Sequence, residues 1–192
     1  MIYFIDDFLP DYILKETIKD LSTQDYEEVK YPTKSFWVQY ASHPFINHVC
    51  GAISGIEGND IEPILAFFRT SNDVVDTNWR IHTDSIINGE KPDRALIVYI
   101  SPRKKTELHG TAIWEHKTYG KSLPKDVTNK EYDRMLLEEA NNLEMWELNS
   151  VIGYNQNRAI SWPANYFHSK YPDKSWKEGR DIFVMFYKTK KI

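Results

Sequence analysis

Apolar residues in the N-terminal third of the chain recur with the spacing of a helix. Residues 3–9 predict a short strand or lead-in, and residues 11–21 then place four apolar side chains on one helical face (Ile13, Leu14, Ile18 and Leu21). A second apolar face covers about residues 44–56, and Gly55 and Gly58 are expected to end that helix. The pattern therefore predicts two helices ahead of the rest of the fold.

From residue 61 onward the pattern changes to short apolar and β-branched runs, which predict strands. These runs cover residues 61–70, 79–82, 95–101, 111–116, 157–162 and 181–188. The run 95–101 is almost wholly apolar, as expected of a strand that is buried on both faces. One helix interrupts the strands over residues 128–142, where Thr128 and Glu131 have the spacing of a capping box. We interpret this helix as part of an insertion at about residues 122–147.

The length of 192 residues suits one domain, with residues 1–60 as an N-terminal helical support and residues 61–192 as a core that carries the helical insertion. Aromatic residues make up 14% of the chain, which favours a β-rich fold because aromatic side chains pack well on half-buried sheets. We expect a mainly β (α+β) fold, a double-stranded β-helix or jelly roll with the N-terminal helices packed on one sheet. The hydrophobic pattern alone would equally fit an ordinary β-sandwich.

Charge and composition argue against several function classes. The net charge of −4 gives no electrostatic drive toward nucleic acid or an anionic membrane, so neither is an expected partner. No apolar run approaches the ~20 residues that span a bilayer, and the N-terminus lacks the basic region of a signal peptide, so the expected compartment is the cytoplasm. The single cysteine, Cys50, permits no internal disulfide. The expected partner is a small-molecule or peptide substrate, whose identity the sequence leaves open, as it does the oligomeric state.

Two residues of metal-ligand type stand two positions apart at the end of the predicted strand 79–82. In extended backbone such residues face the same side, so His82 and Asp84 can bind one cation together. A histidine from a distant strand would complete a 2-His-1-carboxylate triad, which suits iron(II), whereas a structural zinc site needs four protein ligands. The spacing alone is a weak signal, because His-x-Asp often arises by chance. His168 is the candidate third ligand, with His109 and His116 as rivals.

A fixed cation is predicted close to this centre. Arg180 opens the last apolar run, twelve residues after His168, and the polar segment between them contains Pro172 and Gly179. We interpret this pattern as a hairpin that places His168 and Arg180 on facing strands. A guanidinium at that point suits a dicarboxylate co-substrate, since it can bind one carboxylate bidentately while the other end of the co-substrate chelates the metal.

The run of residues 79–187 resembles the catalytic core of iron(II)- and 2-oxoglutarate-dependent dioxygenases, and it is most similar to their prolyl-hydroxylase-like branch. The similar pieces stand in the family's order along the chain: Trp79-Arg80-Ile81-His82-Thr83-Asp84, the run 95–101, Gly110-Thr111-Ala112-Ile113-Trp114, His168, and the run 180–187. Two features depart from the family pattern. The gap from His168 to Arg180 is longer than usual, and Ile182 stands where some members have a serine.

The resemblance implies a set of cofactors and the residues that bind them. The ligands of iron(II), which are also the catalytic residues, would be His82, Asp84 and His168. 2-Oxoglutarate would be bound by Arg180 and Tyr99, with Ile113 on the strand that lines its pocket, and dioxygen would be the further reactant. The implied activity is oxidative decarboxylation of 2-oxoglutarate coupled to hydroxylation of an unidentified substrate.

Two other function classes fit the same pattern. A cupin-type metal enzyme would use the triad without a keto acid, and a non-catalytic jelly-roll binding module would use neither. The segments 71–78, 85–93 and 120–142 are expected to shape the substrate mouth, because functional contacts concentrate on loops. Four further side chains are predicted to line that mouth: Phe68, Arg69, Arg80 and Trp114.

Overall fold

The computed structural model describes residues 1–31, 34–71, 79–102, 109–171 and 179–190. Its helices are α1 (Asp11–Thr23), α2 (His43–Glu57) and α3 (Asn129–Glu138), and a 3-10 turn covers Leu143–Met145. All three helices lie where the sequence predicts them, although α3 ends earlier than expected. Within the described part of the chain, no helix is both long and apolar enough to cross a lipid bilayer.

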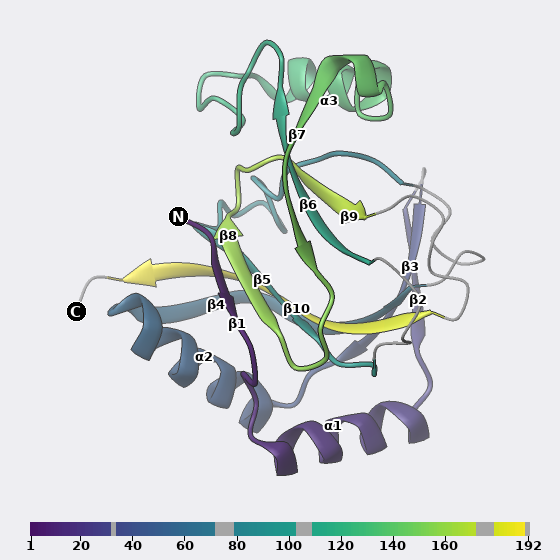
Figure 1. Cartoon of the computed structure of the whole chain (residues 1–192), viewed down its shortest axis with the longest axis vertical. Coiled ribbons are helices and arrows are strands. Elements are labelled where there is room, and N and C mark those ends of the chain that lie inside the picture. Colours follow the sequence, from purple (N-terminus) through teal and green to yellow (C-terminus); the bar gives the residue numbers. More distant parts are fainter. Residues whose placement is uncertain (32–33, 72–78, 103–108, 172–178, 191–192) are drawn as a thin grey trace.

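Antiparallel strands form two sheets (Figure 1). The larger sheet has the strand order β1 (Tyr3–Ile5), β8 (Ala159–Pro163), β5 (Arg94–Tyr99), β10 (Arg180–Lys190), β4 (Asp60–Ser71), β3 (Lys34–Tyr40), β2 (Glu27–Tyr31). The smaller sheet has the order β7 (Trp146–Gly153), β6 (Gly110–His116), β9 (His168–Tyr171). This arrangement is the mainly β, double-stranded β-helix fold that the sequence predicts.

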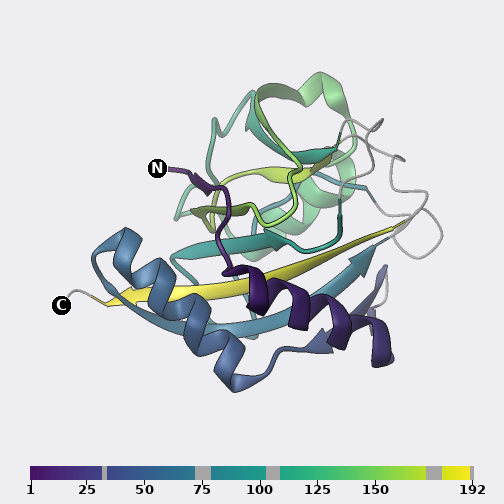
Figure 2. The ribbon, with the colours of Figure 1, turned by 60° about the horizontal axis from the view of Figure 1, so that its bottom comes forward.

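Strand β10 shows why the larger sheet has one face for the helices and one for a pocket. Phe183 and Met185 lie in an apolar cluster with Ile53 of α2, because alternate residues of a strand face opposite sides. The residues between and beside them face the other way, into the space between the sheets (Ile182, Val184 and Phe186). Figures 1 and 2 show α1 and α2 together on the face of the larger sheet that is turned away from the smaller sheet.

Local signals in the sequence set the helix ends. The side chain of Ser42 accepts a hydrogen bond from the backbone N–H of Phe45 at the start of α2. The same helix ends at Gly58, whose φ of 65° is the left-handed conformation that glycine adopts most easily. At α3 the predicted capping box is present, since Thr128 and Glu131 each accept from the other's backbone N–H.

Residues 79–82 do not form the strand that the sequence predicts. Only His82 makes a β-bridge there, with His168. Two residues further on, the backbone N–H of Asp84 donates to the carbonyl oxygen of Ala164 at 2.8 Å. Ala164 lies in the turn between β8 and β9 and not on β9, where His168 is. Because successive partners lie on different elements, the segment cannot continue as a regular ladder.

The predicted hairpin between His168 and Arg180 is also wrong. His168 begins β9, which pairs with β6 in the smaller sheet, whereas Arg180 begins β10, which pairs with β4 and β5 in the larger sheet. The chain between these strands includes residues 172–178, which lie outside the described residues. The two side chains therefore approach one pocket from opposite sheets and not from paired strands.

Three strands, β2, β3 and β7, are absent from the sequence prediction. Strands β2 and β3 pair with each other, and β3 extends the larger sheet beyond β4. Strand β7 pairs with β6. Their sequences mix charged and apolar residues (Glu-Glu-Val-Lys-Tyr in β2), so strand propensity is weak there and pairing with a neighbour decides the conformation. The first sixty residues thus supply strands as well as helices.

Candidate metal centre

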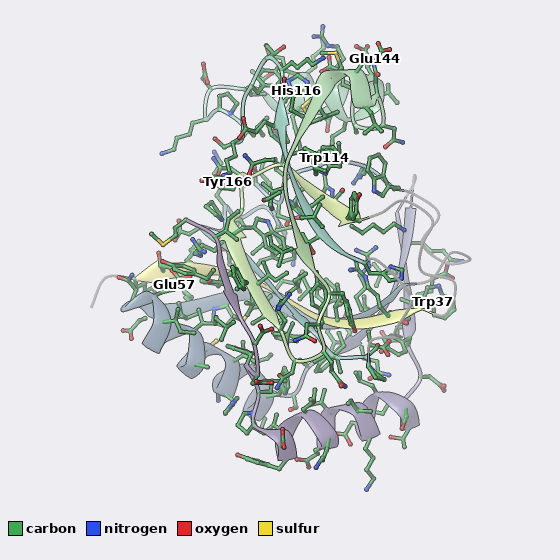
Figure 3. The ribbon with its side chains drawn as sticks, in the orientation of Figure 1. Trp37, Glu57, Trp114, His116, Glu144 and Tyr166 are labelled. Atoms are coloured by element: carbon green, nitrogen blue, oxygen red, sulfur yellow. The ribbon has the colours of Figure 1, made fainter. Side chains whose placement is uncertain are left out.

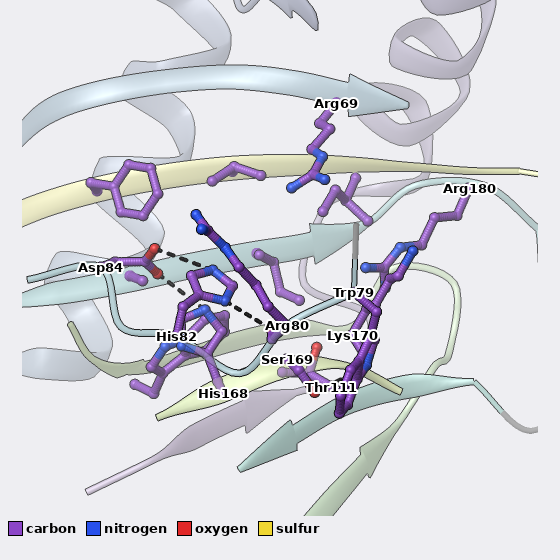
Figure 4. Close-up of a pocket in the computed structure, with 16 residues that line it drawn as sticks. Arg69, Trp79, Arg80, His82, Asp84, Thr111, His168, Ser169, Lys170 and Arg180 are labelled. Carbon is purple, nitrogen blue, oxygen red and sulfur yellow. Dashed lines mark hydrogen bonds and ion pairs between the residues drawn. The ribbon is translucent and has the colours of Figure 1, made fainter. Parts of the chain in front are cut away.

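Three side chains converge at the mouth of the space between the sheets. His82, Asp84 and His168 offer ligand atoms that all lie within 4.8 Å of one another. The carboxylate of Asp84 lies 3.9 Å from Nε2 of His82 and 3.2 Å from Nε2 of His168. Figure 4 shows the carboxylate beside the two adjacent imidazoles, with dashed lines to both. The structure therefore brings together the three residues that the sequence singles out.

Backbone contacts give both imidazoles the same orientation. Nδ1 of His82 lies 3.2 Å from the carbonyl oxygen of Arg80, and Nδ1 of His168 lies 3.0 Å from the carbonyl oxygen of Tyr166. A carbonyl oxygen can only accept, so each Nδ1 carries a proton and each neutral ring keeps its lone pair on Nε2. Those lone pairs are on the atoms nearest Asp84, where they can bind a metal ion.

The carboxylate of Asp84 also favours a proton on His168. Burial lowers the pKa of this imidazole, but the charge of Asp84, its hydrogen bond and the carbonyl of Tyr166 together raise the pKa above its usual range. The His168 side chain is only 8% exposed, whereas that of His82 is 30% exposed. A proton on His168 therefore competes with a metal ion for the same nitrogen.

A tyrosine of the inserted helix holds the backbone between His82 and Asp84. The phenol oxygen of Tyr132 accepts from the backbone N–H of Thr83 at 2.8 Å and donates to the Thr83 carbonyl oxygen at 3.1 Å. It also accepts from the Thr83 hydroxyl at 3.0 Å. The sequence pattern assigns Tyr132 only to the apolar face of a helix, and no local signal indicates this long-range contact. The insertion is thus joined directly to the segment that carries His82 and Asp84.

A pocket lies beside the triad, between the two sheets (Figure 4). The wall from β5, β8 and β10 is apolar (Ala95, Ile97, Trp162, Ile182, Val184 and Phe186). The opposite wall is more polar and comes from the smaller sheet and the segment before the triad (Trp79, Arg80, Thr111, Ser169 and Lys170). Apolar surface with a few convergent polar groups is typical of a small-molecule site.

Arg180, the cation that the sequence predicts near the metal centre, is among the residues that line this pocket. It is the first residue of β10, is 7% exposed and pairs with Ser71 of β4. Figure 4 shows its side chain reaching into the pocket on the side away from Asp84 in that view. A buried guanidinium binds a carboxylate more strongly than an exposed one, because the surroundings screen the charges less.

Tyr99 and Ile113 lie behind the pocket wall and are not among the residues that line it. Tyr99 is fully buried, and its hydroxyl shares a 2.8 Å hydrogen bond with that of Thr111, which does line the pocket. Burial raises the pKa of the Tyr99 phenol, so the phenol keeps its proton and can donate it to Thr111. Ile113 is fully buried opposite His168 in the pairing of β6 with β9.

The four residues predicted for the substrate mouth divide into two pairs. Arg69 and Arg80 line the pocket. Phe68 instead packs in the apolar cluster under the helices, and Trp114 packs in a second cluster near the insertion. The indole N–H of Trp114 donates to the hydroxyl of Ser169 at 2.9 Å, so this side chain supports a pocket residue from behind.

Neither rival histidine belongs to the triad. Nε2 of His116 lies 2.6 Å from a carboxylate oxygen of Glu139, and Figure 3 shows His116 toward the inserted helix. His109 is buried, stands one residue before β6, and lies outside the group of three. His116 therefore ties β6 to the insertion.

Comparison with known proteins finds similarity in structure and not in sequence. No protein-family model matches the chain, and no curated protein matches it. A non-haem, alpha-ketoglutarate-dependent epimerase of nogalamycin biosynthesis, SnoN, superposes with a TM-score of 0.66 at 10% identity, over 97% of this chain and 78% of that one. HygX from Streptomyces hygroscopicus, solved with nickel and 2-oxoglutarate, superposes with a TM-score of 0.62 at 9% identity. The superposition covers 97% of this chain and 82% of HygX.

A prolyl-4-hydroxylase from Pseudomonas putida is also similar, with a TM-score of 0.54 at 9% identity, over 97% of this chain and 92% of that one. At such low sequence identities, structural similarity shows the fold but does not determine which reaction the protein catalyses. The chain has the double-stranded β-helix fold of non-haem, 2-oxoglutarate-dependent enzymes.

Proposed function

We propose that the protein is a non-haem iron(II) oxygenase that couples oxidative decarboxylation of 2-oxoglutarate to hydroxylation of a substrate. The observation that carries the proposal is the convergence of His82, Asp84 and His168 at a pocket that also contains the buried Arg180. Solved proteins of this fold include an epimerase and a carbocyclase beside the prolyl hydroxylases, and hydroxylation is the outcome we propose here.

The donor set fits iron(II). Two imidazole nitrogens and one carboxylate form the facial triad of non-haem iron(II) oxygenases, which leaves positions on the metal for other ligands. Among the described residues the cluster contains these three groups and no cysteine, whereas structural zinc sites have four protein ligands. His82, Asp84 and His168 would hold the ion through Nε2, the carboxylate and Nε2.

The pocket fits a dicarboxylate co-substrate. Arg180 would bind the carboxylate distant from the metal, and the hydroxyl of Thr111 would add a hydrogen bond while it accepts one from Tyr99. Thr111 would thereby supply the hydroxyl that some relatives of this fold take from a serine at the position of Ile182. The indole N–H of Trp162 is buried and has no hydrogen-bond partner within the described part of the chain. A bound oxygen ligand would provide one.

The residues of this chain would act by positioning and by exclusion of water. A loaded centre of this kind supplies oxidative decarboxylation of the keto acid with dioxygen, coupled to oxidation of a substrate C–H bond. The apolar wall of Ile182, Val184 and Phe186 would keep water from the co-substrate and strengthen its contacts with Arg180. Tyr132 would fix the backbone that carries two of the ligands.

A spectroscopic titration tests the proposal. The protein is loaded with iron(II) under anaerobic conditions, and 2-oxoglutarate is added while the visible spectrum is recorded. We expect a weak metal-to-ligand charge-transfer band, which His82→Ala abolishes. Arg180→Met should raise the Kd of 2-oxoglutarate about tenfold or more, since it removes a charge-assisted contact. Arg134→Met is the matched control, because Arg134 is 66% exposed on α3.

The possible outcomes separate the function classes. Iron binding without a band would favour a metal enzyme that uses no keto acid. No iron binding would leave a binding module, and an unchanged Kd in Arg180→Met would remove Arg180 from the co-substrate site.

A further inference from the structure

Strand β10, which begins with Arg180, extends past the end of one of its two neighbours. On one side it pairs with β4 from Arg180 onward. On the other side its pairing with β5 begins only at Ile182, opposite Tyr99, where β5 ends. The ladder with β5 thus stops two residues short of Arg180. Contacts that hold the first two residues of β10 on this side must come from beyond the end of β5.

The two residues that follow β5 bind Asp181 where the ladder has stopped. The backbone N–H groups of Ile100 and Ser101 both donate to the carbonyl oxygen of Asp181, at 3.0 and 3.3 Å. The hydroxyl oxygen of Ser101 accepts a short hydrogen bond from the backbone N–H of Asp181. That hydroxyl also donates to the Asp181 carboxylate at 2.9 Å. The backbone and the side chain of Asp181 are therefore both bound to one short segment.

A phenol from the N-terminal part of the chain completes this network. Tyr26, which lies between α1 and β2, donates its O–H to the other carboxylate oxygen of Asp181 at 2.9 Å. Burial, the charge of Asp181 and this hydrogen bond all raise the pKa of Tyr26, so the phenol keeps its proton and remains a donor. Ser101 is held in turn, because its carbonyl oxygen accepts from the hydroxyl of Tyr154.

The side chain of Asp181 is turned away from the pocket. Alternate residues of a strand face opposite sides of the sheet, so Ile182 lines the pocket together with Arg180, whereas Phe183 packs in the cluster under the helices. Asp181 shares the face of Phe183 and is not among the residues that line the pocket. An effect of Asp181 on a ligand in the pocket must therefore pass through the backbone of Arg180.

A guanidinium binds a carboxylate bidentately only if its planar donors are held at the right distance and angle. We propose that the network of Asp181, Ser101 and Tyr26 is a positioning device for the start of β10. It holds the guanidinium of Arg180 where the far carboxylate of 2-oxoglutarate binds, and so sets the affinity for that co-substrate. The inference rests on the proposed oxygenase function and adds three positioning residues to its co-substrate site.

Binding of two keto acids to the loaded protein tests the inference without turnover. Nickel(II) replaces iron(II), and 2-oxoglutarate and pyruvate are each titrated calorimetrically. Pyruvate has the metal-chelating end of 2-oxoglutarate but lacks the far carboxylate. Ser101→Ala removes the hydroxyl that contacts Asp181, and Tyr26→Phe removes one hydrogen bond and keeps the ring. We expect the Kd of 2-oxoglutarate to rise about fivefold in Ser101→Ala and about threefold in Tyr26→Phe, whereas that of pyruvate changes less than about twofold.

A double variant shows whether the network acts through Arg180. In an Arg180→Met background the far carboxylate has lost its guanidinium, so Ser101→Ala should not raise the Kd of 2-oxoglutarate further. Tyr40→Phe is the matched control for Tyr26→Phe, because Tyr40 is 68% exposed on β3.

Three results would overturn the inference. The first is an unchanged Kd of 2-oxoglutarate in both single variants, and the second is an equal loss of pyruvate binding. The third is a full additional effect of Ser101→Ala in the Arg180→Met background. Failure of the unmodified protein to bind 2-oxoglutarate at the loaded centre would instead overturn the proposed function, and with it the inference.

Discussion

The two segments that carry the triad are held in different ways. His168 begins a regular strand, and its side chain is 8% exposed between Trp162 and the imidazole of His82. His82 and Asp84 lie on irregular backbone, and the side chain of His82 is 30% exposed. One side chain of the triad is therefore placed by a sheet and its core, and the other two are placed by separate hydrogen bonds.

The irregular segment takes its conformation from several elements at once. His82 exchanges two backbone hydrogen bonds with His168, at 3.0 and 2.9 Å, and Asp84 donates to Ala164. Tyr132 contacts the N–H and the carbonyl of Thr83 from the inserted helix. Loss of one such contact leaves the others in place, so we expect graded effects on this side of the triad. Loss of packing around His168 should instead destabilise the fold.

Removal of either imidazole should have the largest effect on iron(II) binding. It also gives the sharpest test of the difference between the irregular His82–Asp84 segment and the packed strand that carries His168. His82→Ala and His168→Ala should each weaken iron(II) binding about 100-fold or more, because a metal ligand matters at least as much as its outer-shell partners. Only His168→Ala should also lower the free energy of unfolding of the metal-free protein, by about 2 to 4 kcal/mol, since it leaves a cavity in the core. The cost of His82→Ala should be about 1 kcal/mol or less.

Metal content and urea denaturation measure the two quantities. His43→Ala is the matched control, because His43 is an exposed histidine at the start of α2 and should keep both metal and stability. Equal losses of stability in the two triad variants would contradict the proposed difference between the segments.

Tyr132→Phe should have an intermediate effect on iron(II) binding, and it should disturb only the irregular segment that carries His82 and Asp84. The ring remains to fill its place, but the hydrogen bonds to Thr83 are lost, so the His82–Asp84 segment becomes less well positioned. We expect the affinity for iron(II) to fall about tenfold, as for other outer-shell partners of metal ligands. Competition with a coloured chelator measures the affinity, and Tyr12→Phe on the exposed face of α1 is the control. An unchanged affinity would show that the insertion does not support the site.

The same contrast explains how much of the site the sequence predicts. His82 and Asp84 are two residues apart, so their common direction follows from local geometry, and the capping box of α3 is local as well. The pairing of β9 with β6 is not local, so the sequence does not indicate it. The polar segment between His168 and Arg180 has the composition of a hairpin turn, which is why the sequence predicts one there. The contact of Tyr132 with Thr83 spans 49 positions of the chain, and nothing near either residue indicates it.

Residues in and behind the pocket wall also depend on contacts that the sequence does not indicate. The sequence places Tyr99 near the co-substrate through a resemblance, but the structure puts the hydroxyl of Thr111 between Tyr99 and the pocket. Of the four residues predicted for the substrate mouth, Arg69 and Arg80 line the pocket, whereas Phe68 and Trp114 do not. In a strand a shift of one position reverses the face, so the choice between Phe68 and Arg69 depends on register, which pairing with β10 sets.

The pH dependence gives the smallest expected effect, and it concerns the buried side of the triad. In the metal-free protein the pKa of His168 is raised above its unfolded value, near 6.5, by Asp84 and the Tyr166 carbonyl against the opposing effect of burial. A raised folded-state pKa means that the protonated form stabilises the fold. That stabilisation is fully present below the unfolded pKa and is lost as the pH rises through the folded pKa.

Iron binding should follow the opposite course, because the metal needs the neutral imidazole. Between about pH 6 and pH 8.5 we expect the affinity for iron(II) to rise, by at most about tenfold per pH unit, while the melting temperature of the metal-free protein falls. Chelator competition and thermal melts follow the two trends. Asp84→Asn should flatten the fall in melting temperature, since it removes the charge that favours the proton on His168. A metal-free stability that rises over this range would show that burial dominates at His168, and the two sides of the triad would then differ in packing alone.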